Sequence, residues 1–131
     1  MKQSMLMEKY PISEMDIMKS ETTFSTVDEV IAYLKEKIDA HPVATYIATF
    51  DHYTHTKNLG EAGEISADIL DAKNIICCFG KQLPKPTLLA VRPRAIGVAE
   101  LKDKFVVSFI DAPNPQAHEF MVAWVKSIVN K

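Results

Sequence analysis

Residues 95–131 read AIGVAELKDKFVVSFIDAPNPQAHEFMVAWVKSIVNK, and this stretch determines the fold. Its two apolar segments, residues 95–101 and 105–110, are separated by Lys102, Asp103 and Lys104, a short polar connection typical of a β-hairpin. Asn114 and Pro115 then supply an N-cap and a first-turn proline, after which apolar residues recur at helical spacing. The stretch therefore predicts two paired strands followed by an amphipathic helix.

A second amphipathic helix is predicted earlier in the chain. Thr26 followed three residues later by Glu29 is a capping-box pattern, and His41-Pro42 ends the helix because proline disfavours an α conformation in the residue before it. The apolar stripe of this helix consists of Val27, Val30, Ile31, Leu34 and Ile38. Both helices must bury such a stripe against another element, and a sheet is the available partner.

Further strands are predicted at residues 12–19, 43–50 and 75–79, and a short helix at residues 66–70. We expect an N-terminal arm over residues 1–11 and a single domain over residues 12–131. The predicted fold class is α+β, with one twisted antiparallel sheet of about five strands and two main helices on one face. The element order is strand, helix, four strands, helix.

Composition excludes several classes of protein. The chain has 131 residues, 47% hydrophobic content and a formal net charge of −2, which disfavours nucleic acid and membrane surfaces as partners because both attract a strongly positive protein. Cys77 and Cys78 are neighbours and are not placed to form a disulfide framework. With no export signal in residues 1–7, we expect a cytoplasmic protein.

Three short motifs suggest a family. Phe50-Asp51-His52 ends one predicted strand, Phe79-Gly80 ends a buried strand, and Asp111-Ala112-Pro113 follows the closing hairpin. With these motifs the chain resembles a large bacterial family, the domain-of-unknown-function family numbered 302. The resemblance implies the fold typified by the TATA-binding protein, and it implies no particular activity.

The first group of candidate site residues follows the strand at 43–50. Asp51, His52 and His55, with Cys78 as a further ligand, have side chains that bind zinc in other proteins. The alternative is a polar loop in which Asp51 accepts hydrogen bonds from nearby backbone. We assign no metal and expect no cofactor.

The second group is Arg92-Pro93-Arg94. The proline restricts Arg92 to an extended conformation, so the two guanidinium groups can project to similar sides and hold a carboxylate or phosphate. The alternative is a structural role, with internal acids such as Asp51, Glu64 or Asp111 as partners. Cys78 is also a candidate nucleophile, although its apolar surroundings disfavour the thiolate.

Three classes of function remain from these residues. The favoured class is a small-molecule or anion-binding module, with Asp51, His52, His55, Cys78, Arg92 and Arg94 around one pocket. The second is a metal- or thiol-dependent enzyme, and the third is an interaction protein without a small-molecule site. We expect a homodimer, formed through an edge strand or a free helix face. The pocket requires the loop after Phe50 to lie near the loop after Val91.

Overall fold

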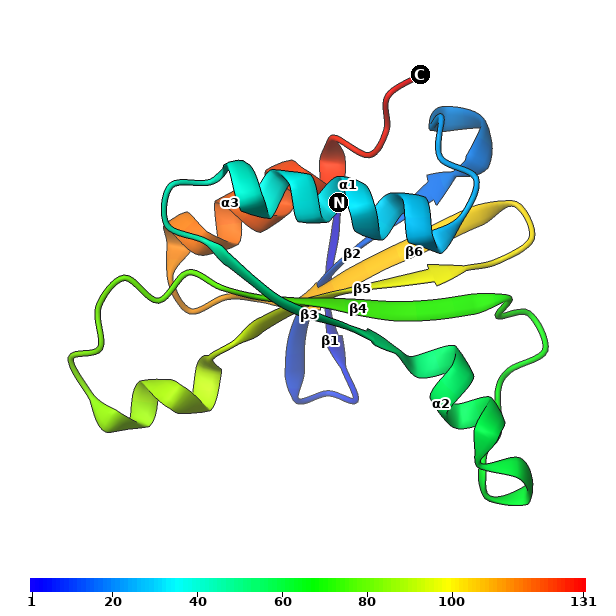
Figure 1. Ribbon diagram of the computed structural model, residues 1–131, viewed down its shortest axis with the longest axis horizontal. Coiled ribbons are helices and arrows are strands. Elements are labelled where there is room, and N and C mark those ends of the chain that lie inside the picture. The colour runs from blue at the N-terminus through cyan, green and yellow to red at the C-terminus, as the bar shows by residue number, and fades with distance from the viewer.

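A single antiparallel sheet forms the centre of the molecule (Figure 1), which is described over residues 1–131 by a computed structural model. The strands lie side by side in the order β1-β2-β6-β5-β4-β3. Their bounds are β1 (Lys2–Leu6), β2 (Tyr10–Met18), β3 (Thr45–Asp51), β4 (Asp71–Cys78), β5 (Arg94–Glu100) and β6 (Lys104–Ile110). The predicted α+β class with one antiparallel sheet is confirmed, with six strands in place of about five.

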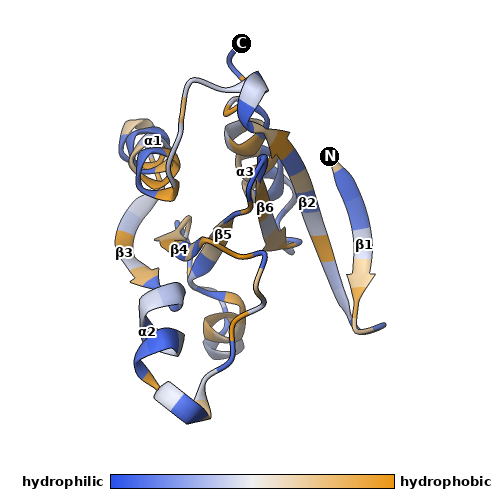
Figure 2. Cartoon of the chain, turned by 90° about the vertical axis from the view of Figure 1, so that its right-hand side faces the viewer, coloured by the Kyte–Doolittle hydropathy of each residue, from blue (hydrophilic) through white to orange (hydrophobic).

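The two long helices, α1 (Val27–Ala40) and α3 (Pro115–Lys126), cover the same face of this sheet. Figure 2, turned by a right angle, shows both of them on one side and the short helix α2 (His52–Asn58) on the other. The predicted caps are present, since Thr26 Oγ1 accepts from Glu29 N at 3.1 Å and Asn114 Oδ1 accepts from the first turn of α3. These bonds satisfy backbone donors that the helix itself leaves unpaired.

The core lies between the sheet and the two long helices. Ile75, Ile96 and Val107 point from neighbouring central strands toward α1 and α3, and each is buried completely. The buried stripes of α1 and α3 meet them, with Leu34 and Met121 also fully buried. Each such side chain stabilises the fold by roughly 1.5–3 kcal/mol relative to an exposed one. This layer holds the strand ends, and therefore the loops at both ends of the sheet, in fixed positions.

One predicted element is wrong, and two observed elements were not predicted. The short helix predicted at residues 66–70 is wrong, because the chain there makes only a turn before β4, which starts earlier than predicted, at Asp71. A helix forms instead at α2, where Asp51 caps a polar segment without an apolar stripe to reveal it. The strand β1 was not predicted, since its residues are almost all exposed and pair only with β2.

The turn between β1 and β2 contains Met7 and Glu8, both with positive φ (54° and 60°). Two successive residues with positive φ match the right-handed twist of a hairpin, although glycine and asparagine adopt this conformation more easily. Between β4 and β5 the chain forms a 3₁₀ helix, η3 (Pro86–Val91). None of the helices combines the length and the apolar composition needed to span a bilayer.

Candidate functional site

The six predicted site residues lie at two different ends of the sheet. In the β3–β4 pair Asp51 lies opposite Lys73, whereas in the β4–β5 pair Arg94 lies opposite Cys77. Lys73 and Cys77 are four positions apart on β4, which corresponds to about 13 Å along a strand. The expectation that the loops after Phe50 and Val91 lie together is therefore wrong. The chain leaves β3 where β4 begins and enters β5 where β4 ends, so antiparallel pairing separates these loops.

At the first of these ends, Asp51 has a structural role. Its carboxylate accepts hydrogen bonds from N and Oγ1 of Thr54, both at 2.9 Å, and so caps α2. The backbone hydrogen bond from Thr54 is the main reason that the pKa of Asp51 lies below its usual value, and the ammonium of Lys73 at 3.7 Å contributes less. Asp51 thus accepts from nearby backbone as the alternative predicted, although the segment after it is helix α2 and not a loop.

The two histidines of this end are held by neighbours on the uncovered side of the sheet. His52 Nε2 lies 2.7 Å from the side-chain nitrogen of Asn74, and its ring meets Phe50 edge-on at 4.5 Å. The His55 ring lies 5.5 Å from the same phenylalanine. Cys78 lies at the opposite end of β4, and nowhere in the chain do three His, Cys, Asp or Glu side chains converge on one point. The zinc hypothesis therefore has no geometric support.

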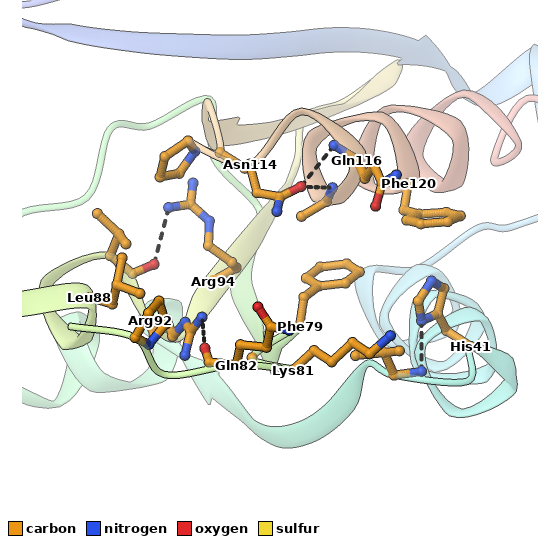
Figure 3. A pocket seen from close by; sticks show the side chains of 17 residues that line it. His41, Phe79, Lys81, Gln82, Leu88, Arg92, Arg94, Asn114, Gln116 and Phe120 are labelled. Atoms are coloured by element: carbon orange, nitrogen blue, oxygen red, sulfur yellow. Dashed lines mark hydrogen bonds between the residues drawn. The ribbon is translucent and has the colours of Figure 1, made fainter. Parts of the chain in front are cut away.

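A cavity of about 600 Å³ occupies the other end of the sheet. Its walls come from the end of α1, the segment from Phe79 through η3 to Arg94, and the start of α3 (Figure 3). Its seventeen lining residues are His41, Val43, Phe79, Gly80, Lys81, Gln82, Pro84, Leu88, Val91, Arg92, Arg94, Ala112, Pro113, Asn114, Gln116, Ala117 and Phe120. Three of them are cations and none is acidic. Its volume falls within the range of small-molecule sites.

Arg94 is the most unusual of these residues. It is the first residue of β5 and points to the helix-covered side, as does its partner Cys77. Its Nη1 donates to the carbonyl of Val91 at 3.4 Å, its Nη2 donates to the carbonyl of Ile110, and its Nε is buried without any partner. Burial lowers the pKa of the guanidinium, because desolvation disfavours the charged form. Arg94 is thus a half-buried cation fixed by backbone carbonyls alone.

No carboxylate compensates either arginine. No Asp or Glu oxygen lies within 4.0 Å of the nitrogens of Arg92 or Arg94, so the predicted alternative of internal acidic partners is not realised. Asp111 is near enough to favour the charged form of Arg94, but its Oδ1 accepts from the hydroxyl of Ser13 at 2.6 Å. Neither arginine is therefore in direct contact with a carboxylate of the chain.

Arg92 lies beside Arg94 on the cavity wall. Its backbone is extended (φ −126°, ψ 143°), as the following proline requires, and the Arg92–Pro93 peptide bond is cis. Nη2 donates to the carbonyl of Gln82 at 2.6 Å, which links the two ends of the loop that carries η3. Gly80 allows this approach, since a Cβ there would lie 3.1 Å from Arg92 Nη1. Both arginines therefore line the same cavity.

The apolar wall is aromatic. Phe79 and Phe120 have nearly parallel rings with centroids 6.4 Å apart, and the His41 ring meets Phe120 edge-on at 4.3 Å. His41 Nδ1 accepts from the backbone N–H groups of Val43 and Ala44, so its ring proton lies on Nε2. Trp124 stacks beneath Phe79 at 5.4 Å and is 7% exposed.

The two thiols differ in position. Cys77 is buried, and burial raises the pKa of its thiol to about 11, so the nucleophilic thiolate is not formed near neutral pH. Cys78 points to the other side of the sheet, where its Sγ accepts from Gly80 N at 3.2 Å. It borders the cavity segment without lining the cavity itself. Cys77 therefore lacks the exposed setting of a catalytic cysteine, whereas Cys78 is partly exposed.

Sequence reasoning found the two arginines of this site and missed its other polar and aromatic residues. Asn114 was predicted only as a helix cap, and His41 only as a helix end. Phe79 was assigned to the end of a strand, and Phe120 lies within the amphipathic helix predicted after Pro115. The available signal was that His41, Phe79 and Asn114 each stand at the end of an element, where antiparallel strands and their helices bring side chains to a common edge.

The fold and this cavity together define an α+β domain with a sheet covered on one side and a cationic, aromatic-lined site at one end. The chain belongs to a family of unknown function, DUF6858, whose model matches residues 1–130. The resemblance to family 302 is therefore wrong, since its short motifs are strand ends that unrelated sheets also produce. No curated protein and no solved structure matches the chain, so the likeness to the TATA-binding protein stays a prediction.

Proposed function

We propose that the chain is a binding module for a small organic anion, held in the cavity at the end of β4, β5 and β6. The observation that supports this proposal most strongly is Arg94, a half-buried guanidinium with no carboxylate partner and a buried, unpaired Nε. A desolvated cation is unfavourable in the empty protein, and a bound anion would restore the lost interaction.

The surrounding charges favour the same class of ligand. Arg92 and Lys81 line the same cavity, and no Asp or Glu does, although the whole chain carries a net charge of −2. Arg92 and Arg94 are the only arginines of the chain. A local concentration of positive charge in a weakly negative protein steers small anions to this end of the molecule.

Binding can be measured through the single tryptophan. Trp124 is stacked on Phe79, which lines the cavity, so an occupant should change its fluorescence. We would titrate the protein, in phosphate-free buffer, with phenylacetate, phenyl phosphate and the neutral 2-phenylethanol. At least one of the two anions should give a saturable change that the alcohol does not give. The same anion should protect both arginines from modification by phenylglyoxal.

Two variants test whether the arginines are responsible. Arg94→Gln should weaken anion binding at least about tenfold, as expected for loss of a charge-assisted contact. Because Arg94 also ties Val91 to Ile110, Arg92→Gln provides an independent variant that leaves those bonds in place. Lys126→Gln, an exposed cation in the last turn of α3, is the matched control. Equal binding of the alcohol, or binding unchanged in both arginine variants, would contradict the proposal.

A second candidate, a homodimeric interaction protein, has support at the opposite edge of the sheet. The β1–β2 hairpin exposes Met5, Leu6, Met7 and Tyr10, and β1 has a free edge that can pair with another strand. We propose a second copy of the chain as its partner. The free state of both cysteines fits a cytoplasmic location, which we also propose.

A further inference from the structure

Asn114 has a double role that follows from its position between α3 and the cavity. Its Oδ1 accepts hydrogen bonds from the backbone N–H groups of Gln116 at 2.9 Å and Ala117 at 3.2 Å. Only the amide oxygen can accept two such donors, so the orientation of the amide is fixed by the cap. The side-chain nitrogen then points away from the helix, into the cavity, on the side where Arg94 lies (Figure 3).

The helix itself has few donors left for a ligand. Pro115 has no N–H group, the N–H groups of Gln116 and Ala117 are taken by Asn114, and the N–H of His118 donates to the Asn114 carbonyl at 3.0 Å. Phosphate sites at helix N-termini normally use these free backbone N–H groups. At the start of α3 they are already occupied, which leaves side-chain donors to bind an anion.

Beside the start of α3, the donors of Arg94 and Asn114 match a group with two oxygens. Two of the five N–H groups of Arg94 donate to carbonyls, so its guanidinium is held in one plane and its other donors stay unpaired. The Asn114 amide adds one further donor aimed into the same part of the cavity. A planar carboxylate fits between a fixed guanidinium and a single amide, whereas a phosphate monoester presents three terminal oxygens.

The opposite part of the cavity is suited to a ring. Phe120 is 42% exposed although it belongs to the aromatic cluster with His41 and Phe79. A flat apolar group placed against it would be covered by aromatic faces and edges, the arrangements that aromatic pairs prefer. The cavity therefore joins a cationic part to an aromatic part in one volume of about 600 Å³.

From this arrangement we infer that the ligand is a small aromatic carboxylic acid, with its carboxylate between Arg94 and the Asn114 amide and its ring against Phe79 and Phe120. This inference rests on the proposed anion-binding function and names its ligand class. Asn114 is a specificity-determining residue in this arrangement, because its amide nitrogen donates to a carboxylate without adding to the positive charge of Lys81, Arg92 and Arg94.

The test compares ligands and uses a substitution that separates capping from binding. Phenylacetate should bind at least about tenfold more tightly than phenyl phosphate, and also more tightly than acetate, when measured by calorimetry at one ionic strength. Asn114→Asp keeps an equally good N-cap, since aspartate and asparagine cap helices similarly, but replaces the donor with a negative charge. It should retain the melting temperature of the parent protein and lose at least about tenfold in phenylacetate affinity.

Three further variants complete the comparison. Asn114→Ser keeps a cap without charge and should lose less affinity than Asn114→Asp. Asn58→Asp introduces the same charge change at the end of α2, at the other end of the sheet, and should bind like the parent. Phe120→Leu should weaken binding of phenylacetate and leave that of acetate unchanged.

The outcomes distinguish this inference from the proposed function. Tighter binding of phenyl phosphate than of phenylacetate would overturn the carboxylate assignment and leave the anion-binding module in place. Parent-like affinity in Asn114→Asp would overturn the role of Asn114. Absence of binding for both anions would overturn the proposed function and this inference together.

Discussion

Cys77 and Arg94 lie opposite each other on β4 and β5, and both point into the helix-covered layer. Burial disfavours the charged form of each side chain, and it therefore shifts the two pKa values in opposite directions. It raises the pKa of the Cys77 thiol to about 11, with a smaller lowering by the Arg94 charge, and it lowers the pKa of the guanidinium. At neutral pH the thiol is therefore uncharged, and it cannot serve as the counterion of Arg94.

The buried thiol predicts a loss of stability in alkali. The pKa of Cys77 is raised from 9.0 to about 11 in the folded protein, so the unfolded chain loses its proton first. Its stabilising contribution is present below pH 9 and is lost as the pH rises toward 11, by up to about 2–3 kcal/mol. Urea unfolding at pH 8 and pH 10.5 should show that the parent loses about 2 kcal/mol more than Cys77→Ala over this interval. Other titrating groups are common to both proteins, so an equal loss in the two would refute the burial argument.

At the scale of elements, both long helices and five of the six strands could be predicted from the sequence. Their apolar stripes have a clear period, and the caps at Thr26 and Asn114 mark where the helices start. The elements without a buried apolar stripe, α2 and β1, show no such pattern in the sequence. Helix α2 has no buried residue and is held by local hydrogen bonds such as its cap. Strand β1 lies outside the core and is held by pairing with β2.

Helix α2 should depend on its cap. Asp51→Ala removes the acceptor for Thr54 N, and such cap losses lower the free energy of unfolding by about 1 kcal/mol. Asp51→Asn keeps an acceptor and should stay near the parent in a denaturant titration at neutral pH. Because hydrogen bonds lower the pKa of Asp51, its contribution is present above the unfolded pKa and is lost as the pH falls through the folded one. An Asp51→Ala variant as stable as the parent would show that the cap contributes nothing.

At the scale of the whole molecule, the arrangement of the candidate site depended on strand order, which the sequence did not reveal. The identity of Arg92 and Arg94 as a pair could be predicted, because Pro93 fixes them locally. Their separation from Asp51 could not, since it follows from the antiparallel register of β3, β4 and β5. The chemistry of neighbouring residues could be predicted from the sequence, whereas the pairing of strands that are distant in the sequence required the structure.

The exposed position of β1 at the edge of the sheet allows a prediction for a chain that lacks residues 1–9. Residues 1–9 contribute no fully buried side chain, and β1 pairs only with β2. A chain lacking them should unfold cooperatively and lose less stability than Leu34→Ala, for which about 2–5 kcal/mol is expected. If the second candidate function holds, light scattering should find a dimer for the parent and a monomer for the truncated chain. A truncated chain that fails to fold would show that the hairpin belongs to the core.

The segment from Phe79 to Arg94 supplies most of the polar lining of the cavity, and Gly80 to Thr87 within it are exposed throughout. Most polar groups of the proposed binding site thus come from one continuous stretch that contributes little to the packed layer. A protease that clips the accessible bond after Lys81 would detach the loop on one side while the sheet and helices stay assembled. Under the anion-binding function proposed above, such a nicked molecule would remain folded but would bind the anion more weakly, so cleavage of this loop would inactivate the protein without unfolding it.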